Sequence, residues 1–239
     1  FPTRRSSDLA AVLRLNLIDP AITLATLAPF QRVTAGTLVG TVKIIAYGVG
    51  GAALDRACTV AAAAALRVLP VVRKSAGLVL TEVPGQDDKL TAKGRRAIET
   101  RLRALGLALS WVEVVAHDEA AIAAALGRLS GDMLLILTAS ATSDLHDTAP
   151  AALRLAGGRV HRFGMPVDPG NLLFHGDLSG RPVIGLPGCA RSPALNGADW
   201  VLERYACGLT VSDADIAAMG VGGLLKEITQ RPQLREPKG

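Results

Sequence analysis

A hydroxyl-rich loop is the first place where this sequence could do chemistry. The loop runs from Thr138 to Asp147, directly after an apolar run, and it contains Ser140, Thr142 and Ser143. Hydroxyls, together with backbone N–H groups at the start of a following helix, suit a phosphate or a carbonyl-rich ligand. The same residue types are also ordinary helix caps, and capping alone is an equally good interpretation of any one of them.

Asp147 ends this loop and is the carboxylate with the most chemistry open to it. It can cap a helix that begins at Thr148, accept hydrogen bonds from an N–H-rich heterocycle, or help to hold a cation. These alternatives stay open from the sequence. If Asp147 contacts a ligand, Asp147→Asn is expected to weaken binding and to leave thermal unfolding nearly unchanged.

Two glycine- and proline-rich loops follow along the chain. Glycines let the backbone approach a ligand closely, and prolines reduce the entropy that a loop loses on binding. Arg191 is the natural partner for an anion, although a solvated surface arginine is commoner. The candidate binding residues in these two loops are Asp168, Gly170 and Asn171 in Gly164–Asn171, and Gly185, Gly188 and Arg191 in Gly185–Pro193.

Other chemistries have weaker support. Asp144 and His146 form a D-x-H, and Gly176–Arg181 contains a Gly-Asp turn, but the later histidine elements of a two-metal phosphoesterase are missing. No G-x-S-x-G elbow supports a serine nucleophile beside His146. Cys189 is better explained as a small buried filler than as a reactive thiol. We therefore predict no metal site and assign no catalytic residue.

These loops need elements to position them, and from Lys74 onward the hydrophobic pattern is regular. Helical stripes contain Ile98, Leu102 and Leu105, and then Ile122, Leu126 and Leu129, with Asp118 as a predicted N-cap. Further helices are expected over 148–156 and 196–207. Strands are expected over 76–83, 107–115, 133–138, 159–163 and 182–186. Strands that alternate with amphipathic helices predict a three-layer α/β/α sandwich with a mostly parallel sheet.

The remaining chain is divided by composition. Residues 1–9, FPTRRSSDL, match one reading frame of a sequencing adapter and are interpreted as an artefact. Residues 10–73 are expected to be a partial N-terminal segment with β-like runs over 12–17, 22–27 and 38–47 and a helix over 52–66. Residues 74–210 are expected to form the main domain. Residues 211–239 are expected to be a C-terminal extension, proline-broken and charged from Thr229, that reads as a linker.

Composition limits the possible functions. Hydrophobic residues make up 49% of the chain, which is enough for a core, whereas aromatics make up 3%, too few for a nucleic-acid stacking platform. The formal net charge of +5 is spread along the chain, so no polyanion partner is required. Three cysteines without a pairing pattern favour a reducing cytoplasm, and no apolar run is long enough for a membrane span. No nucleic acid or membrane partner is therefore expected.

The order of the three loops resembles the molybdopterin-binding domain shared by molybdopterin adenylyltransferases and molybdotransferases. The resemblance covers about Gly77 to Leu209. The chain is most similar to bacterial molybdopterin-binding proteins that are often fused ahead of a molybdenum cofactor cytidylyltransferase. The stretches that carry this similarity are Ile22–Leu27, Thr41–Ile45, Arg162–Leu173, Pro182–Pro193 and Gly220–Ile228.

The resemblance implies a role in molybdenum cofactor biosynthesis, in which this domain holds molybdopterin by its phosphate at the carboxyl edge of the sheet. An active nucleotidyl- or molybdotransferase that uses Mg²⁺ and a nucleoside triphosphate is the first alternative. A scaffold that docks a nucleotidyltransferase domain is the second, and a homo-oligomer is compatible with each.

The chain departs from the family pattern at three places. Ala139 and Ala141 replace a double glycine, Val167–Asn171 lacks two lysines of the family motif, and Gln86–Lys89 replaces an Asp-Ser-Asn. These changes affect transfer chemistry more than binding.

Overall fold

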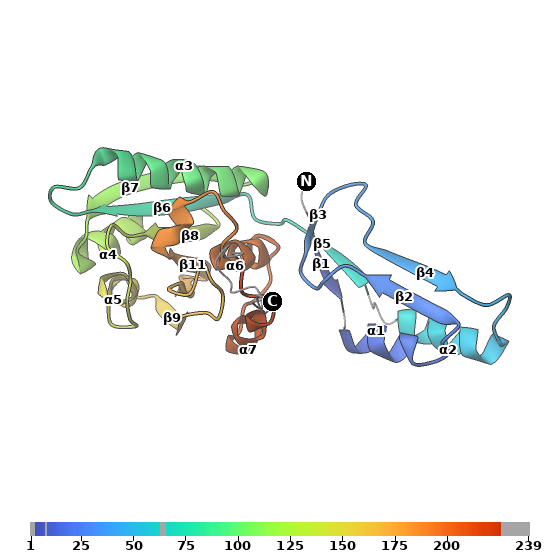
Figure 1. Ribbon diagram of the computed structural model, residues 1–239. Coiled ribbons are helices and arrows are strands. Elements are labelled where there is room, and N and C mark those ends of the chain that lie inside the picture. The colour runs from blue at the N-terminus through green and yellow to red at the C-terminus, as the bar shows by residue number, and fades with distance from the viewer. Residues whose placement is uncertain (1–2, 8, 63–65, 226–239) are drawn as a thin grey trace, which may run out of the picture. The chain divides into compact units, whose positions relative to one another are not determined.

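The computed structural model describes residues 3–7, 9–62 and 66–225. The chain divides into two compact units. Unit 1 comprises Phe1–Val72 and Ala206–Gly208, and unit 2 comprises Arg73–Tyr205 and Leu209–Gly239. Their helices and strands are labelled in Figure 1. The predicted linker from Thr229 lies outside the described residues.

Unit 2 contains the predicted α/β sandwich. Its six-stranded sheet has the order β7-β6-β8-β11-β10-β9, in which neighbours among the first four strands are parallel, whereas β10 is antiparallel to both β11 and β9. The strands are β6 (Ser75–Glu82), β7 (Ala108–Ala116), β8 (Met133–Leu137), β9 (Arg159–Phe163), β10 (Phe174–Leu178) and β11 (Arg181–Leu186). The helices are α3 (Asp88–Ala104), α4 (Glu119–Arg128), α5 (Thr148–Leu155), α6 (Gly197–Ala206) and α7 (Asp213–Ala217), with short 3₁₀ turns η1 (Gly188–Arg191) and η2 (Ala218–Gly220). The fold class predicted from the sequence is confirmed.

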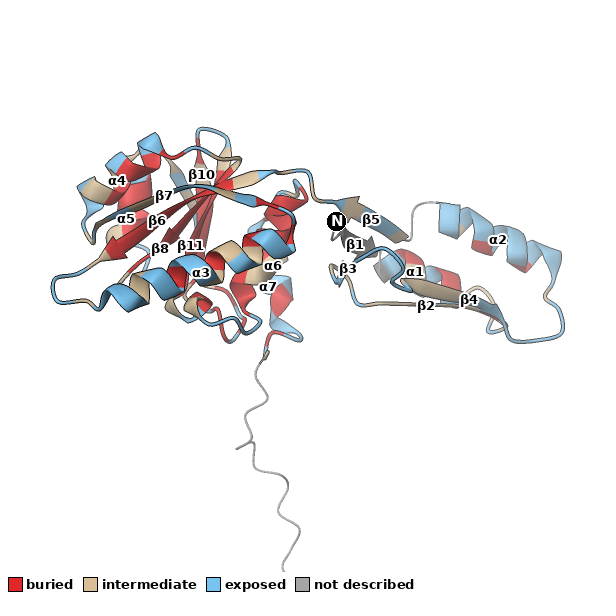
Figure 2. Ribbon diagram, turned by 90° about the horizontal axis from the view of Figure 1, so that it is seen from above, coloured by how far each residue is buried: buried red, intermediate tan, exposed pale blue. Residues whose placement is uncertain are grey.

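Helices cover both faces of this sheet. Figure 2 shows α4 and α5 on one side of the sheet and α3 on the other. All five residues of β8 are buried, as expected for a central strand between two helical layers. The core on the α4–α5 side includes Val79, Ile122, Leu126, Leu134, Ile136, Leu153 and Phe174. The predicted stripes on α3 and α4 are buried, and Asp118 accepts a hydrogen bond from the backbone N–H of Ala121 as the predicted N-cap.

One strand of unit 2 was mispredicted as a turn. Residues 174–178 form β10, so Gly176 and Asp177 lie in a strand and the turn is at Ser179 and Gly180. A Cβ on Gly176 would lie 1.9 Å from the Arg159 carbonyl oxygen, so the glycine is needed for close approach of β9. The Gly-Asp element of the phosphoesterase alternative is therefore part of the sheet.

Unit 1 is built from two small antiparallel sheets and two helices. One sheet has the order β3-β1-β5, and the other pairs β2 with β4. Leu15, Ile22, Ala53 and Ala57 form its buried cluster. The elements are β1 (Thr3–Ser7), α1 (Leu9–Asn16), β2 (Ile22–Thr26), β3 (Arg32–Val33), β4 (Gly40–Ile44), α2 (Gly51–Ala62) and β5 (Leu66–Pro70).

Two local predictions in unit 1 need correction. The run over 12–17 was expected to be β-like but lies mostly in α1, where Ala11 and Leu15 are buried four residues apart, as the helical period requires. The helix predicted to reach residue 66 is described only to Ala62, residues 63–65 lie outside the described residues, and Leu66 begins β5. Thr3–Ser7, which lies in the stretch interpreted as an artefact, forms β1 and pairs with β3 and β5.

Candidate functional site

The three candidate loops reach the carboxyl edge of the sheet in unit 2. The loop after β8 and the loop after β11 follow neighbouring parallel strands, so both leave the sheet at the same edge. Gly164–Leu173 joins the end of β9 to the start of β10, where Phe174 pairs with Gly185 near the end of β11. This edge is where open α/β sheets bind ligands.

The hydroxyl-rich loop after β8 is fixed by its own first residues. Thr138 is buried and donates a hydrogen bond of 2.6 Å to the Ser140 carbonyl. The backbone N–H of Ala139 donates to Thr81 Oγ1 at 2.7 Å, which joins this loop to the end of β6. Ser140 and Ser143 are exposed, whereas Thr142 is buried. Two of the three predicted hydroxyl residues are therefore accessible to a ligand.

Asp147 is the N-cap of α5. Its Oδ1 accepts a hydrogen bond from the Thr148 N–H at 2.7 Å, and its Oδ2 accepts from the Ser143 N–H at 2.9 Å and from Ser143 Oγ at 3.2 Å. Burial alone would raise the pKa of Asp147, but these hydrogen bonds and the nearby His117 hold it below its usual value. The structure therefore gives Asp147 a structural role, and a ligand contact by this residue stays a prediction.

Replacement of Asp147 by asparagine is therefore expected to lower stability, contrary to the sequence-based expectation. The NH₂ group of asparagine would place an N–H donor opposite the Ser143 N–H, which is itself a donor. The free energy of unfolding of the variant should therefore be about 1–2 kcal/mol lower than that of the wild type at neutral pH. Because the pKa of Asp147 is lowered in the fold, its stabilisation is present above the unfolded pKa and is lost as pH falls through the folded pKa. Urea unfolding at neutral and acidic pH measures both effects, with the exposed Asp144→Asn as control. Equal stability of Asp147→Asn and the wild type at neutral pH would contradict the cap.

The second loop is fixed by close backbone packing. Gly170 has a φ of +138°, and a Cβ there would lie 2.7 Å from the Gly197 nitrogen at the start of α6. The Gly197 N–H also donates to the Pro169 carbonyl at 2.8 Å. Asp168 and Asn171 are exposed. Gly170 therefore serves packing, and Asp168 and Asn171 are the side chains of this loop that a ligand could reach.

The same loop is paired with a C-terminal segment. The N–H of Asp168 donates to the Gly223 carbonyl, and the N–H of Leu225 donates to the Asp168 carbonyl, both at 2.8 Å. Residues 211–225 thus fold as part of unit 2, with Ser212 and Asp215 forming a capping box at α7. The described part of the expected C-terminal extension holds the Asp168 backbone in place.

Of the three candidate residues in the third loop, only Gly188 and Arg191 lie beyond the end of β11. Gly185 is a buried residue of β11, and a Cβ there would lie 1.8 Å from the Phe174 ring, so this glycine makes room in the core and does not shape the loop. Gly188 begins η1, and a Cβ there would lie 3.7 Å from Arg191 Nη1. The expected role of Gly185 in the loop is therefore wrong.

Arg191 is a partly buried cation at this edge, and the described residues satisfy only part of its hydrogen-bonding capacity. Its Nη2 donates to the Thr138 carbonyl at 2.6 Å, which joins the third loop to the first. Its Nε is buried without a hydrogen-bond partner, and no carboxylate of the described residues forms a salt bridge with it. Burial lowers the pKa of the half-buried guanidinium. A cation that is partly desolvated and not paired is suited to binding an anion.

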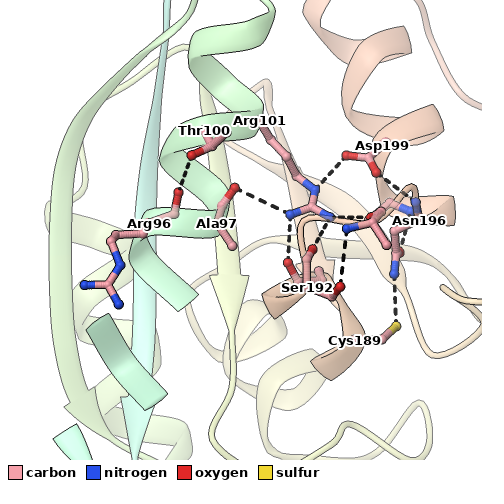
Figure 3. Close-up of polar contacts among 11 residues, drawn as sticks. Arg96, Ala97, Thr100, Arg101, Cys189, Ser192, Asn196 and Asp199 are labelled. Atoms are coloured by element: carbon pink, nitrogen blue, oxygen red, sulfur yellow. Dashed lines mark hydrogen bonds and ion pairs between the residues drawn. The ribbon is translucent and has the colours of Figure 1, made fainter. Parts of the chain in front are cut away.

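Arg101 supports this arrangement, although no local sequence pattern points to it. Its side chain is 9% exposed and its Nε forms a 2.7 Å ion pair with Asp199. Its other nitrogens donate to the carbonyls of Ala190, Ser192 and Ala194. Figure 3 shows this guanidinium between α3 and the loop after β11. Arg101 thus holds the backbone on both sides of Arg191.

Cys189 and His146 show no arrangement of a nucleophile with its base. Cys189 is exposed, so its expected role as a buried filler is wrong, and its sulfur accepts a hydrogen bond from Asn196 Nδ2 at 3.0 Å. The backbone N–H of His146 donates to Asp144 Oδ1. Within the described ranges, no three His, Cys, Asp or Glu side chains gather where they could hold a metal ion. The phosphoesterase and serine-nucleophile alternatives, which the sequence already disfavours, gain no support from these contacts.

Comparison with known proteins gives a limited result. No protein-family model and no curated protein sequence matches this chain. The chain is similar to a solved structure, a molybdopterin biosynthesis MoeA protein from Pyrococcus horikosii, with 19% sequence identity and a TM-score of 0.42. The match covers 77% of this chain and 51% of the archaeal protein, so the chain spans about half the length of that protein.

A membrane span has no candidate in the part of the chain that the structure describes. None of its helices combines sufficient length with sufficient apolar character to cross a bilayer.

Proposed function

We propose that unit 2 binds molybdopterin for molybdenum cofactor biosynthesis and holds its phosphate at the carboxyl edge of the sheet. The observation that carries the proposal is Arg191, a half-buried guanidinium with an unpartnered Nε between the loops after β8 and β11. Ser140 and Ser143 lie in the loop that Arg191 contacts and offer exposed hydroxyls to the same anion. The resemblance of the three loops to the molybdopterin-binding domain supplies the identity of the ligand.

The described residues supply binding and positioning. Arg191 would neutralise the phosphate, and Asp168 and Asn171 would contact the polar edges of the pterin ring from the loop between β9 and β10. A transferase would in addition need Mg²⁺ at the phosphates of a nucleoside triphosphate. Mg²⁺ at substrate phosphates is held by only one or two protein carboxylates, and no described contact assigns that role to a particular residue, so we derive no transfer step.

Replacement of Arg191 by methionine is expected to weaken binding of molybdopterin by about 10- to 100-fold, because hydrogen bonds to a charged group contribute about 1.5–3 kcal/mol each. The measurement is the fluorescence of oxidised pterin released from protein that was incubated with molybdopterin and then desalted. Arg191→Lys, which keeps the charge but loses the planar fork, should retain an intermediate amount.

Arg181→Met is the matched control. Arg181 lies at the other end of β11 and also donates to one backbone carbonyl, that of Leu129, at 2.7 Å. The control should retain pterin at the wild-type level. The proposal fails if the wild type releases no pterin, or if Arg191→Met retains as much as Arg181→Met. Pyrophosphate release in the presence of molybdopterin with ATP or CTP would favour the transferase alternative.

A further inference from the structure

The outward side of α3 carries a row of basic side chains. At 100° per residue, Lys89, Lys93, Arg96 and Arg103 lie about 140–180° around the helix from the buried Ile98. All four are exposed, and much of the α3 ribbon in Figure 2 has the pale blue of exposed residues. The row spans about 21 Å along the helix axis. We call these four residues the α3 basic row.

Neighbouring carboxylates do not neutralise this row. Arg103 pairs with Glu99 at 2.9 Å, an exposed contact one helical turn away. Lys89, Lys93 and Arg96 form no ion pair with any described carboxylate. Figure 3 shows the Arg96 side chain pointing away from the Arg101–Asp199 pair. Three cations of the row are therefore available to an external partner.

The position of these cations works against the helix itself. Lys89 is the second residue of α3, where the helix dipole is positive and a carboxylate would be favourable. Lys89 and Lys93 are four residues apart, and Lys93 and Arg96 are three apart, so both pairs place like charges on adjacent turns. Each such placement is mildly destabilising for the helix. No described carboxylate pairs with Lys89, Lys93 or Arg96 to offset this destabilisation of α3. Such an arrangement points to a role in binding a partner.

Charge in unit 2 is also strongly segregated. The helix α3 contains six cationic and two acidic residues, whereas the other described residues of the unit contain nine cationic and fourteen acidic residues. The unit as described is therefore almost neutral, with its excess positive charge on one helix. A nucleic acid would be repelled by the acidic remainder, and α3 has no aromatic side chain for base stacking. A compact acidic surface that contacts only α3 would avoid the acidic remainder of the unit and would need no aromatic side chains.

We propose that the α3 basic row is a docking surface for an acidic surface of a partner protein. The row begins at the carboxyl edge of the sheet, because α3 follows the end of β6, and it runs away from that edge along the helix. A partner docked there would lie next to the candidate anion site without covering it. The proposal does not depend on what that site binds.

Binding of the full chain to a fluorescent poly-L-glutamate peptide tests this surface by anisotropy. We expect saturable binding at about 50 mM salt that weakens by at least about tenfold at about 300 mM salt, as exposed charge pairs do. The triple variant Lys89→Gln/Lys93→Gln/Arg96→Gln should also bind at least about tenfold more weakly than the wild type at low salt.

The control variant removes three exposed cations elsewhere, Lys43→Gln/Arg56→Gln/Arg67→Gln, and changes the net charge equally. It should bind the peptide within about twofold of the wild type, because the proposed contact is local. Equal losses in the two triple variants would show only a net-charge effect and would overturn the proposal. Tighter binding of a DNA duplex than of the peptide would overturn it in favour of a nucleic acid. The absence of peptide binding by the wild type would also overturn it.

Discussion

Replacement of Arg101 by methionine is expected to lower the free energy of unfolding by about 3–5 kcal/mol, the cost of breaking a buried ion pair on one side. Arg101 is 9% exposed and Asp199 is 14% exposed, so the remaining carboxylate would stay largely desolvated without its partner. The carbonyls of Ala190, Ser192 and Ala194 would lose their donors at the same time. Methionine fills a similar volume, so the loss reports the polar contacts more than a cavity.

Unfolding in guanidinium chloride, followed by circular dichroism, measures this effect. Arg103→Met is the matched control on the same helix, because its pair with Glu99 is exposed and should contribute only about 0.3–0.5 kcal/mol. The double variant Arg101→Met/Asp199→Leu should recover part of the loss, since it leaves no unpaired buried charge. A loss below about 1 kcal/mol for Arg101→Met would mean that water replaces the guanidinium and that the pair is not a structural anchor.

The positions of most elements in unit 2 follow from the sequence because their hydrophobic patterns are long and regular. The buried run of β8 and the stripes on α3 and α4 are examples, with Asp118 as a cap that its position alone identifies. β10 was not predicted because it contains Gly176, a residue type that usually indicates a turn. A glycine is needed there because the Arg159 backbone lies close to it, and only the folded sheet brings the two together. α1 escaped because a short run of alanines and leucines fits either period.

The location of the candidate site could be predicted from the sequence, but the roles of its individual residues could be predicted less well. Topology follows from the alternation of strands and helices, so the edge where loops gather can be expected in advance. Whether a residue binds or packs depends on contacts distant in sequence. Gly185 makes room for Phe174, and Arg101 reaches a loop about ninety residues later in the chain. No local sequence pattern predicts either contact.

Acidification between about pH 6.5 and 4 is expected to destabilise unit 2 by up to about 3 kcal/mol through His175 alone. His175 is 1% exposed, and its Nδ1 lies 2.8 Å from the Tyr205 hydroxyl. Its Nε2 is buried without a partner. Burial lowers the pKa of His175 to about 4, and the positive groups His161 and Arg162 act in the same direction, whereas Asp213 opposes them.

The sign of the effect follows from the neutral form that the fold requires. Because the folded pKa lies below the unfolded value of 6.5, the unfolded chain takes up a proton first as pH falls. The stabilisation is complete above the unfolded pKa and is lost as pH falls towards about 4. Tyr205 stays protonated throughout, since burial raises its pKa to about 12. Asp147, whose pKa is lowered, acts in a more acidic range and can be separated from His175.

A double variant isolates the contribution of His175. His175→Phe alone would leave the Tyr205 hydroxyl buried without its partner, whereas His175→Phe/Tyr205→Phe removes both polar groups and should be nearly neutral in stability at about pH 7.5. Urea unfolding at about pH 7.5 and 4.5 should then show a smaller loss in the double variant than in the wild type, by about 2–3 kcal/mol. Replacement of the exposed His146 by glutamine should leave the acid-induced loss of the wild type unchanged. An equal loss in the double variant and the wild type would show that His175 does not set the acid sensitivity, and that its buried ring takes up a proton without cost to the fold.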